Sequence, residues 1–174
     1  MPSQLRVLIP QERLRERVRE MGEEISRDYP EGPLYLVGIL KGSFVFLADL
    51  ARSVSTGVRI DFIGISSYGA AKSSSGEVRV TKDLDISVEG RHVLLVEDIV
   101  DSGVTLTYLT KLIAQRKPQS LRIAALLDKP ERRRTPVNVD YTGFRIPDEF
   151  VVGYGLDYAE DFRQLTSICV LDAG

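Results

Sequence analysis

The stretch Val93–Leu106, VLLVEDIVDSGVTL, constrains this chain most strongly. Its apolar start, Val93–Val96, predicts a β-strand that is buried on both faces. Small and hydroxylated residues follow around Gly103, and an apolar helical pattern begins at Leu106. A strand, a tight loop and a helix N-terminus in this order point backbone N–H groups at an anion. Gly103 permits the positive φ that such a loop needs. The stretch therefore predicts an anion-binding loop in an α/β fold.

Two adjacent acids, Glu97 and Asp98, stand at the C-terminal end of this predicted strand. Their carboxylates could serve sugar hydroxyls or a divalent metal ion, although two acids by themselves are more typical of a solvated strand end. A Walker B strand also ends in acids, but it requires a partner loop of the form G-x-x-x-x-G-K-[ST]. No such string occurs in the chain, which favours the anion-binding loop.

Composition narrows the function classes. The chain has 174 residues, which predicts one domain, and 43% of them are hydrophobic, which is ample for a core. A net charge of −2 and a pI near 5.5 argue against a protein that coats nucleic acid. One cysteine and one histidine exclude a disulfide framework and a zinc site built from these residues. No signal-peptide pattern and no apolar run of about 18 residues occur, which predicts a cytoplasmic protein without a membrane partner.

Hydrophobic periodicity predicts an alternation of strands and helices along the whole chain. This order is typical of an α/β fold with a mainly parallel central sheet that is flanked by helices. The predicted strands are 5–9, 34–40, 58–66, 78–84, 93–96, 121–127, 137–141 with a further short β piece at Phe144, and 167–171, and the predicted helices are 11–29, 44–52 and 105–115.

Two further loops carry chemistry-bearing residues. Lys41-Gly42-Ser43 follows the predicted strand 34–40 directly, and a compact lysine ammonium suits a phosphate. By itself this string would be an ordinary loop with an exposed lysine. The segment Ser67–Glu77 is long, polar and contains one aromatic residue, Tyr68, and loops of this length are usually functional or disordered.

Six motifs occur between Leu34 and Leu171 in the order LKGS, SYG, VEDIVDSGVT, LLDK, IPDEFVVGYGLDY and FRQL. Together they resemble the hypoxanthine-guanine branch of the type I phosphoribosyltransferases. The resemblance implies transfer of the 5-phosphoribosyl group from phosphoribosyl pyrophosphate (PRPP) to N9 of hypoxanthine or guanine, which yields IMP or GMP and pyrophosphate. It also implies Mg²⁺ as cofactor, a homodimer or homotetramer, a lid loop at about residues 66–80, and a small hood built from the N-terminal segment and about residues 130–174.

The resemblance assigns roles to individual residues, and Asp101 is the one expected to act as the general base near purine N7. The residues expected to bind PRPP and its phosphates are Lys41, Gly42, Glu97, Asp98, Asp101, Ser102, Gly103, Val104, Thr105 and Arg163. Those expected to bind the purine are Lys129, Phe150, Val151 and Asp157, and those expected to hold Mg²⁺ are Glu97, Asp98 and Asp157. Ser67 and Tyr68 would belong to the lid, and a non-proline cis peptide bond is expected between Lys41 and Gly42.

Physical chemistry supports the purine assignments. Phe150 offers an aromatic platform for stacking, which contributes about 1–3 kcal/mol per base in nucleic-acid systems. Lys129 can donate a hydrogen bond to a 6-oxo group, and because a cation cannot accept one from an amino group, this residue selects 6-oxopurines over adenine. Arg163 suits pyrophosphate because guanidinium binds phosphate oxygens bidentately.

The sequence departs from the family pattern at two places, and other functions stay open. Val104 stands where some relatives have lysine, so phosphate binding depends more on backbone amides. Glu131–Arg134 contains three consecutive arginines and is expected to be an exposed loop. The alternatives are a xanthine-preferring or uracil-type transferase and a regulatory RNA-binding protein on the same fold. The FVVGYGLDY string disfavours the uracil type, and the acidic pI disfavours RNA binding.

Overall fold

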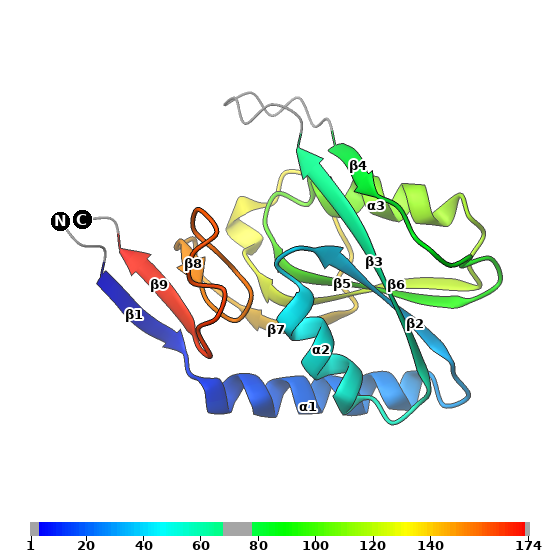
Figure 1. Cartoon of the computed structure of the whole chain (residues 1–174), viewed down its shortest axis with the longest axis horizontal. Coiled ribbons are helices and arrows are strands. Elements are labelled where there is room, and N and C mark those ends of the chain that lie inside the picture. Colours follow the sequence, from blue (N-terminus) through cyan, green and yellow to red (C-terminus); the bar gives the residue numbers. More distant parts are fainter. Residues whose placement is uncertain (1–3, 68–77, 173–174) are drawn as a thin grey trace.

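A computed structural model describes residues 4–67 and 78–172, and its centre is a six-stranded sheet in the order β4-β3-β2-β5-β6-β7 (Figure 1). Its strands are β2 (Leu34–Leu40), β3 (Val58–Ser67), β4 (Val78–Lys82), β5 (His92–Val100), β6 (Ser120–Asp128) and β7 (Tyr141–Arg145). All neighbours pair in parallel except β4, which is antiparallel to β3. The predicted α/β fold with a mainly parallel sheet is therefore confirmed.

Helices cover both faces of this sheet. Alternate residues of a strand point to opposite faces, so Leu36 of β2 packs with α1 (Gln11–Asp28) and α2 (Phe44–Ser53), whereas Val37 packs with α3 (Val104–Ala114). The buried face of α1 consists of Leu14, Val18, Met21 and Ile25, at helical spacing. The central strands are consequently buried on both sides, as their continuous apolar runs indicate.

A second, three-stranded sheet joins the two ends of the chain (Figure 1). It consists of β1 (Gln4–Ile9), β9 (Ile168–Asp172) and β8 (Val151–Val152), all antiparallel, with β9 in the middle. A short 3₁₀ helix, η1 (Pro130–Arg132), follows β6. The small sheet combines segments that the sequence assigns to the hood, while the hood boundaries and the single-domain organisation stay predictions.

Several local predictions are wrong. Strand β5 continues to Val100, because it pairs with β6 as far as Val100 opposite Asp128, so Glu97 and Asp98 lie inside the strand rather than after it. The expected strand 137–141 begins only at Tyr141, since Val137 and Val139 contribute their side chains to the core from a loop. The non-proline cis peptide bond joins Leu40 to Lys41, one bond earlier than expected.

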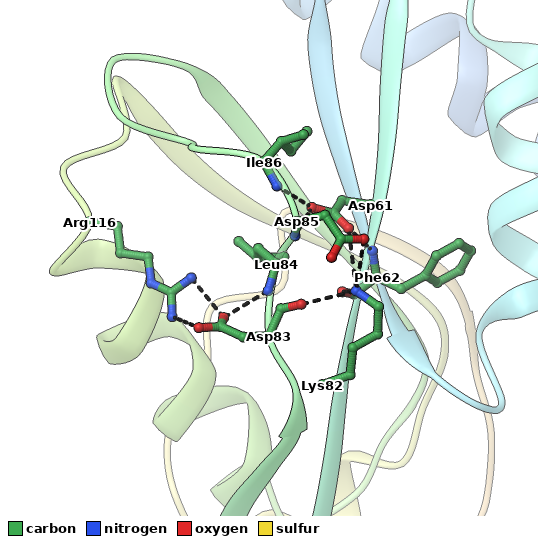
Figure 2. A network of polar contacts seen from close by, with 8 residues as sticks. All are labelled: Asp61, Phe62, Lys82, Asp83, Leu84, Asp85, Ile86 and Arg116. Carbon is green, nitrogen blue, oxygen red and sulfur yellow. Dashed lines mark hydrogen bonds and ion pairs between the residues drawn. The ribbon is translucent and has the colours of Figure 1, made fainter.

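Strand β4 ends at Lys82, earlier than the predicted residue 84. After Lys82 the backbone bonds to the side chain of Asp61 in a polar network (Figure 2). Asp61 of β3 is only 5% exposed, and its Oδ2 accepts the backbone N–H groups of Asp85 at 2.8 Å and Ile86 at 3.1 Å. Lys82 Nζ lies 3.8 Å from Asp61 Oδ1. These contacts satisfy a buried carboxylate and attach the chain after β4 to the sheet.

Part of the predicted lid lies outside the described residues. Tyr68 belongs to the residues that the structure does not describe, and Ser67 ends β3 opposite Val78 of β4. Within residues 4–67 and 78–172, no helix is both long enough and apolar enough to cross a membrane.

Candidate active site

The loop between β5 and α3 has the geometry that the sequence predicts for anion binding. Gly103 precedes the first residue of α3 with φ +86°, a conformation that L side chains rarely adopt. A Cβ at this position would also lie 2.5 Å from the carbonyl oxygen of Thr135. Ser102 Oγ accepts the N–H of Val104 at 3.3 Å. The loop thus turns the N-terminus of α3 toward a cavity of about 280 Å³.

Most of the predicted PRPP ligands gather around this one cavity. Those that line it are Gly42, Glu97, Asp98, Asp101, Ser102, Gly103 and Thr105. A polar hollow of about 560 Å³ continues from Asp101 and Ser102 toward Glu131–Arg134 and Asp148. Another hollow of about 660 Å³, between α1, α2 and the segment 163–166, includes only Arg163 among the predicted residues. The chemistry therefore centres on the carboxyl ends of the parallel strands, as is usual in open α/β sheets.

Glu97, which is buried, and Asp98, which is half-buried, form an acidic wall of the cavity. Burial raises the pKa of Glu97 well above its usual value, and the neighbouring Asp98 raises it further. Burial also raises the pKa of Asp98, while hydrogen bonds from Glu97 and from the N–H of Ile99, 2.6 Å from Asp98 Oδ1, partly oppose this shift. Burial disfavours the ionised form of each side chain, so a bound cation would stabilise the two carboxylates.

The carboxylates fit a magnesium ion only in part. Oxygen donors suit Mg²⁺, which usually binds one or two carboxylates and completes its shell with water and substrate phosphates. Among the described residues, however, no group of three or more His, Cys, Asp or Glu side chains could hold a metal ion by itself. Glu97 and Asp98 can thus provide a pair of ligands, and Asp157 does not join them in one ligand set.

The Lys41-Gly42 loop approaches the acidic wall without room for a side chain. A Cβ at Gly42 would lie 1.8 Å from Asp98 Oδ2. The carbonyl oxygen of Gly42 in turn would lie 2.4 Å from a Cβ at Gly155, which has φ +99°. Ser43 is fully buried and donates to the carbonyl oxygen of Ile39 at 2.7 Å. Gly42 therefore lies between the Asp98 side chain and the backbone at Gly155, which brings three segments distant in sequence together.

This convergence brings together the two cations predicted to bind pyrophosphate. Lys41 Nζ and Arg163 Nη2 each lie 3.2 Å from the carboxylate of Glu160. Arg163 Nη1 donates to the carbonyl oxygen of Gly155 at 2.7 Å, and Arg163 Nη2 lies 3.4 Å from Asp157 Oδ1. Sequence reasoning missed Glu160; its position three residues before Arg163 offered the only signal.

Three residues predicted to bind the purine lie directly after β6, where Lys129 stands, and at the start of β8, where Phe150 and Val151 stand. Phe150 is 51% exposed, and its ring meets Tyr158 edge-on with a centroid distance of 5.7 Å. Val151 is buried in β8. Lys129 is buried, its N–H donates to the carbonyl oxygen of Val100 at 3.0 Å, and its Nζ lies 3.9 Å from Asp148 Oδ1. Sequence reasoning missed Tyr158 and Asp148.

The arginine-rich segment Glu131–Arg134 is exposed for the most part, as expected, but it also contacts the anion-binding loop. Arg132 Nε donates to Asp101 Oδ1 at 2.9 Å, and Arg133 Nη1 donates to the carbonyl oxygen of Asp101 at 3.2 Å. The N–H groups of Arg134 and Thr135 donate to the carbonyl oxygen of Ser102 at 2.9 and 3.0 Å. Asp101 therefore has a cationic neighbour that the motif alone does not indicate.

Comparison with known proteins decides the family. A family profile described as "Phosphoribosyl transferase domain" matches residues 10–159. The chain belongs to the phosphoribosyl transferase family. The resemblance that the sequence motifs indicate is thereby confirmed.

Individual proteins and structures that resemble this phosphoribosyl transferase indicate its branch of the family. It is 49% identical over 166 residues to the hypoxanthine-guanine phosphoribosyltransferase of Bacillus subtilis, which covers 95% of this chain and 92% of that protein. It is 50% identical to the bifunctional protein TilS/HprT of Listeria monocytogenes, over 95% of this chain but only 26% of that longer protein. A crystal structure of a Bacillus anthracis hypoxanthine-guanine phosphoribosyltransferase superposes with a TM-score of 0.93 at 46% identity and covers 96% of this chain and 98% of that one.

Proposed function

We propose that this phosphoribosyl transferase moves the 5-phosphoribosyl group of PRPP to N9 of hypoxanthine or guanine, in purine salvage. One observation carries the proposal: the anion-binding loop and the Glu97–Asp98 pair line one cavity together with Gly42, whose neighbour Lys41 meets Arg163 through Glu160. These two parts suit the 5′-phosphate with the ribose and the pyrophosphate, and Phe150 and Lys129 are the residues expected to bind the purine. The names of the relatives support the same reaction.

Each part would bind one group of the substrates. The loop Asp101–Thr105 would hold the 5′-phosphate with backbone N–H groups and hydroxyls, because the N-terminus of α3 favours an anion. Glu97 and Asp98 would meet the ribose hydroxyls. Lys41 and Arg163 would bind the pyrophosphate group and stabilise the charge that it gains as its bond to ribose C1 breaks.

The purine would lie on Phe150, with the backbone of Val151 at its edge. Lys129 would donate to the 6-oxo group, which excludes adenine. When purine N9 attacks ribose C1 and pyrophosphate leaves, positive charge develops on the base, and Asp101 would accept the N7 proton or stabilise the protonated ring. Bound Mg²⁺ would neutralise and orient the pyrophosphate group, with the Glu97–Asp98 pair and, at a separate position, Asp157 as candidate ligands.

Substitution of Asp101 tests the assigned chemistry. General-base groups contribute about 10²–10⁴-fold, so Asp101→Asn should lower kcat by about that factor while the KM for PRPP changes little. Glu131→Gln is the matched control, since Glu131 lines the adjacent hollow and has no ion pair among the described residues. Unchanged turnover of Asp101→Asn would exclude Asp101 as the base.

One assay separates the alternative functions. Hypoxanthine, guanine, xanthine, adenine and uracil are compared as acceptors with PRPP and Mg²⁺. The proposal expects activity with the first two, and a preference for xanthine or uracil would contradict it. RNA binding that weakens with salt, without transferase activity, would instead indicate the regulatory class. The cytoplasmic location and the homodimer or homotetramer stay predictions.

A further inference from the structure

A single carboxylate connects the two cations predicted to bind pyrophosphate. Glu160 Oε2 lies 3.2 Å from Lys41 Nζ, and Glu160 Oε1 lies 3.2 Å from Arg163 Nη2. Each oxygen therefore serves a different cation, which is how the oxygens of a diphosphate would also bridge them. Lys41 follows β2, whereas Glu160 and Arg163 lie before β9, so the folded chain alone creates this arrangement.

The local backbone presents Glu160 at this place. Glu160 has φ +71°, and its N–H donates to Asp157 Oδ2 at 2.8 Å. The neighbouring residues Tyr158 and Asp161 exchange two backbone hydrogen bonds of 3.0 and 2.9 Å, which close the turn. Arg163 is held from the other side by its 2.7 Å hydrogen bond to the carbonyl oxygen of Gly155. The carboxylate is thus aimed at the cations by a defined turn.

The charge state agrees with this geometry. Arg163, and to a smaller extent Lys41, hold the pKa of the Glu160 carboxyl below its usual range. Glu160 is therefore ionised at neutral pH and acts as an anion toward both cations. A diphosphate that approaches Lys41 and Arg163 meets a negative charge that already occupies their N–H groups.

We propose that Glu160 is an internal competitor for pyrophosphate. It pairs with Lys41 and Arg163 when the site is empty, and it gives up these contacts when a diphosphate group binds. The competition lowers the affinity of the site for the diphosphate group of PRPP and for the pyrophosphate product. The lower affinity for pyrophosphate favours release of this product. This inference rests on the proposed function, which assigns pyrophosphate to Lys41 and Arg163.

Removal of the carboxylate tests the competition. Binding of inorganic pyrophosphate with Mg²⁺ is measured by calorimetry on the full chain, and the KM values for PRPP and the purine are measured in steady state. Exposed ion pairs contribute little each, so Glu160→Gln should lower the Kd for pyrophosphate and the KM for PRPP by about 3- to 10-fold. The KM for the purine should stay within about twofold, because Glu160 has no ion pair with Lys129.

Two further variants make the result specific. Asp161→Asn removes the same charge one residue away, where the side chain has no ion pair with the described residues, and it should change the Kd by less than about twofold. Glu160→Gly removes the carboxylate with a residue that suits the positive φ, so it should reproduce the effect of Glu160→Gln. High salt should reduce the difference from wild type.

The outcomes separate this inference from the proposed function. Transferase activity with equal or weaker pyrophosphate binding by Glu160→Gln overturns the competitor role alone. An effect of Asp161→Asn as large as that of Glu160→Gln also overturns it, since it would show a general charge effect. Wild-type protein with neither transferase activity nor pyrophosphate binding overturns both proposals.

Discussion

At the scale of single residues, Gly42 lies directly against the acidic wall. A Cβ there would lie 1.8 Å from Asp98 Oδ2, so a side chain would displace the Asp98 carboxylate or the Lys41-Gly42 loop. We expect Gly42→Ala to reduce kcat/KM for PRPP by about 100-fold, because displacements near 1 Å in a reacting site can cost that much. Steady-state kinetics at saturating purine measure the loss.

The matched control for Gly42→Ala is Gly57→Ala. No atom of the described residues lies within 4 Å of a Cβ at Gly57, and its φ is not in the left-handed region. This variant should keep wild-type activity and stability. If Gly42→Ala also keeps wild-type kcat/KM, the close approach of the loop to Asp98 has no part in the reaction.

At the scale of elements, Asp61 attaches the segment after β4 to the edge of the central sheet (Figure 2). Asp61→Ala leaves the N–H groups of Phe62, Asp85 and Ile86 without their carboxylate partner. Since hydrogen bonds to a charged group contribute about 1.5–3 kcal/mol, we expect the free energy of unfolding to fall by about 2–3 kcal/mol. Urea denaturation measures the change.

Asp85→Ala serves as the control for that element. Asp85 belongs to the same network, but its side chain is 78% exposed, and its ion pair with Lys82 spans 3.2 Å at the surface. Loss of an exposed pair should cost less than about 1 kcal/mol. Equal destabilisation by Asp61→Ala and Asp85→Ala would contradict a special role of the buried carboxylate.

At the scale of the whole molecule, the first strand, β1, supports residues near the C-terminus that are expected to bind the purine. Strand β9 lies between β1 and β8, and the N–H of Leu171 donates to the carbonyl oxygen of Phe150 at 2.9 Å. Deletion of residues 1–9 would leave one edge of β9 unpaired, while its other edge holds Phe150 and Val151. We expect the KM for hypoxanthine to rise about tenfold, which corresponds to 1.4 kcal/mol, with a smaller change in the KM for PRPP.

Deletion of residues 1–3 alone is the control, because it leaves β1 intact. This shorter deletion should have wild-type KM values, and circular dichroism should show that both proteins keep their helices. A larger change in the KM for PRPP than in the KM for hypoxanthine after the 1–9 deletion would contradict the link between β1 and purine binding by Phe150 and Val151.

Much of the fold and of the site follows from the sequence by itself. Apolar runs that are bounded by charge predict buried parallel strands, and 3.6-residue periodicity predicts the helices. Both patterns arise within a few residues, because each shows which side chains of an element are buried. The family, the α/β architecture and the loop around Gly103 are predictable for this reason. The turn at Asp101–Gly103 follows from two local features: Gly103 can adopt a positive φ, and the Ser102 hydroxyl accepts the N–H of Val104.

Only the tertiary structure decided how distant side chains meet. The contacts of Glu160 with Lys41 and Arg163, and that of Arg132 with Asp101, join segments whose separation in sequence carries no signal of proximity. The end of β5 at Val100 depends on its partner strand, since strand length is determined by pairing across the sheet. Local periodicity therefore specifies which elements form, while the charge state and the partners of the site residues arise only when those elements pack together.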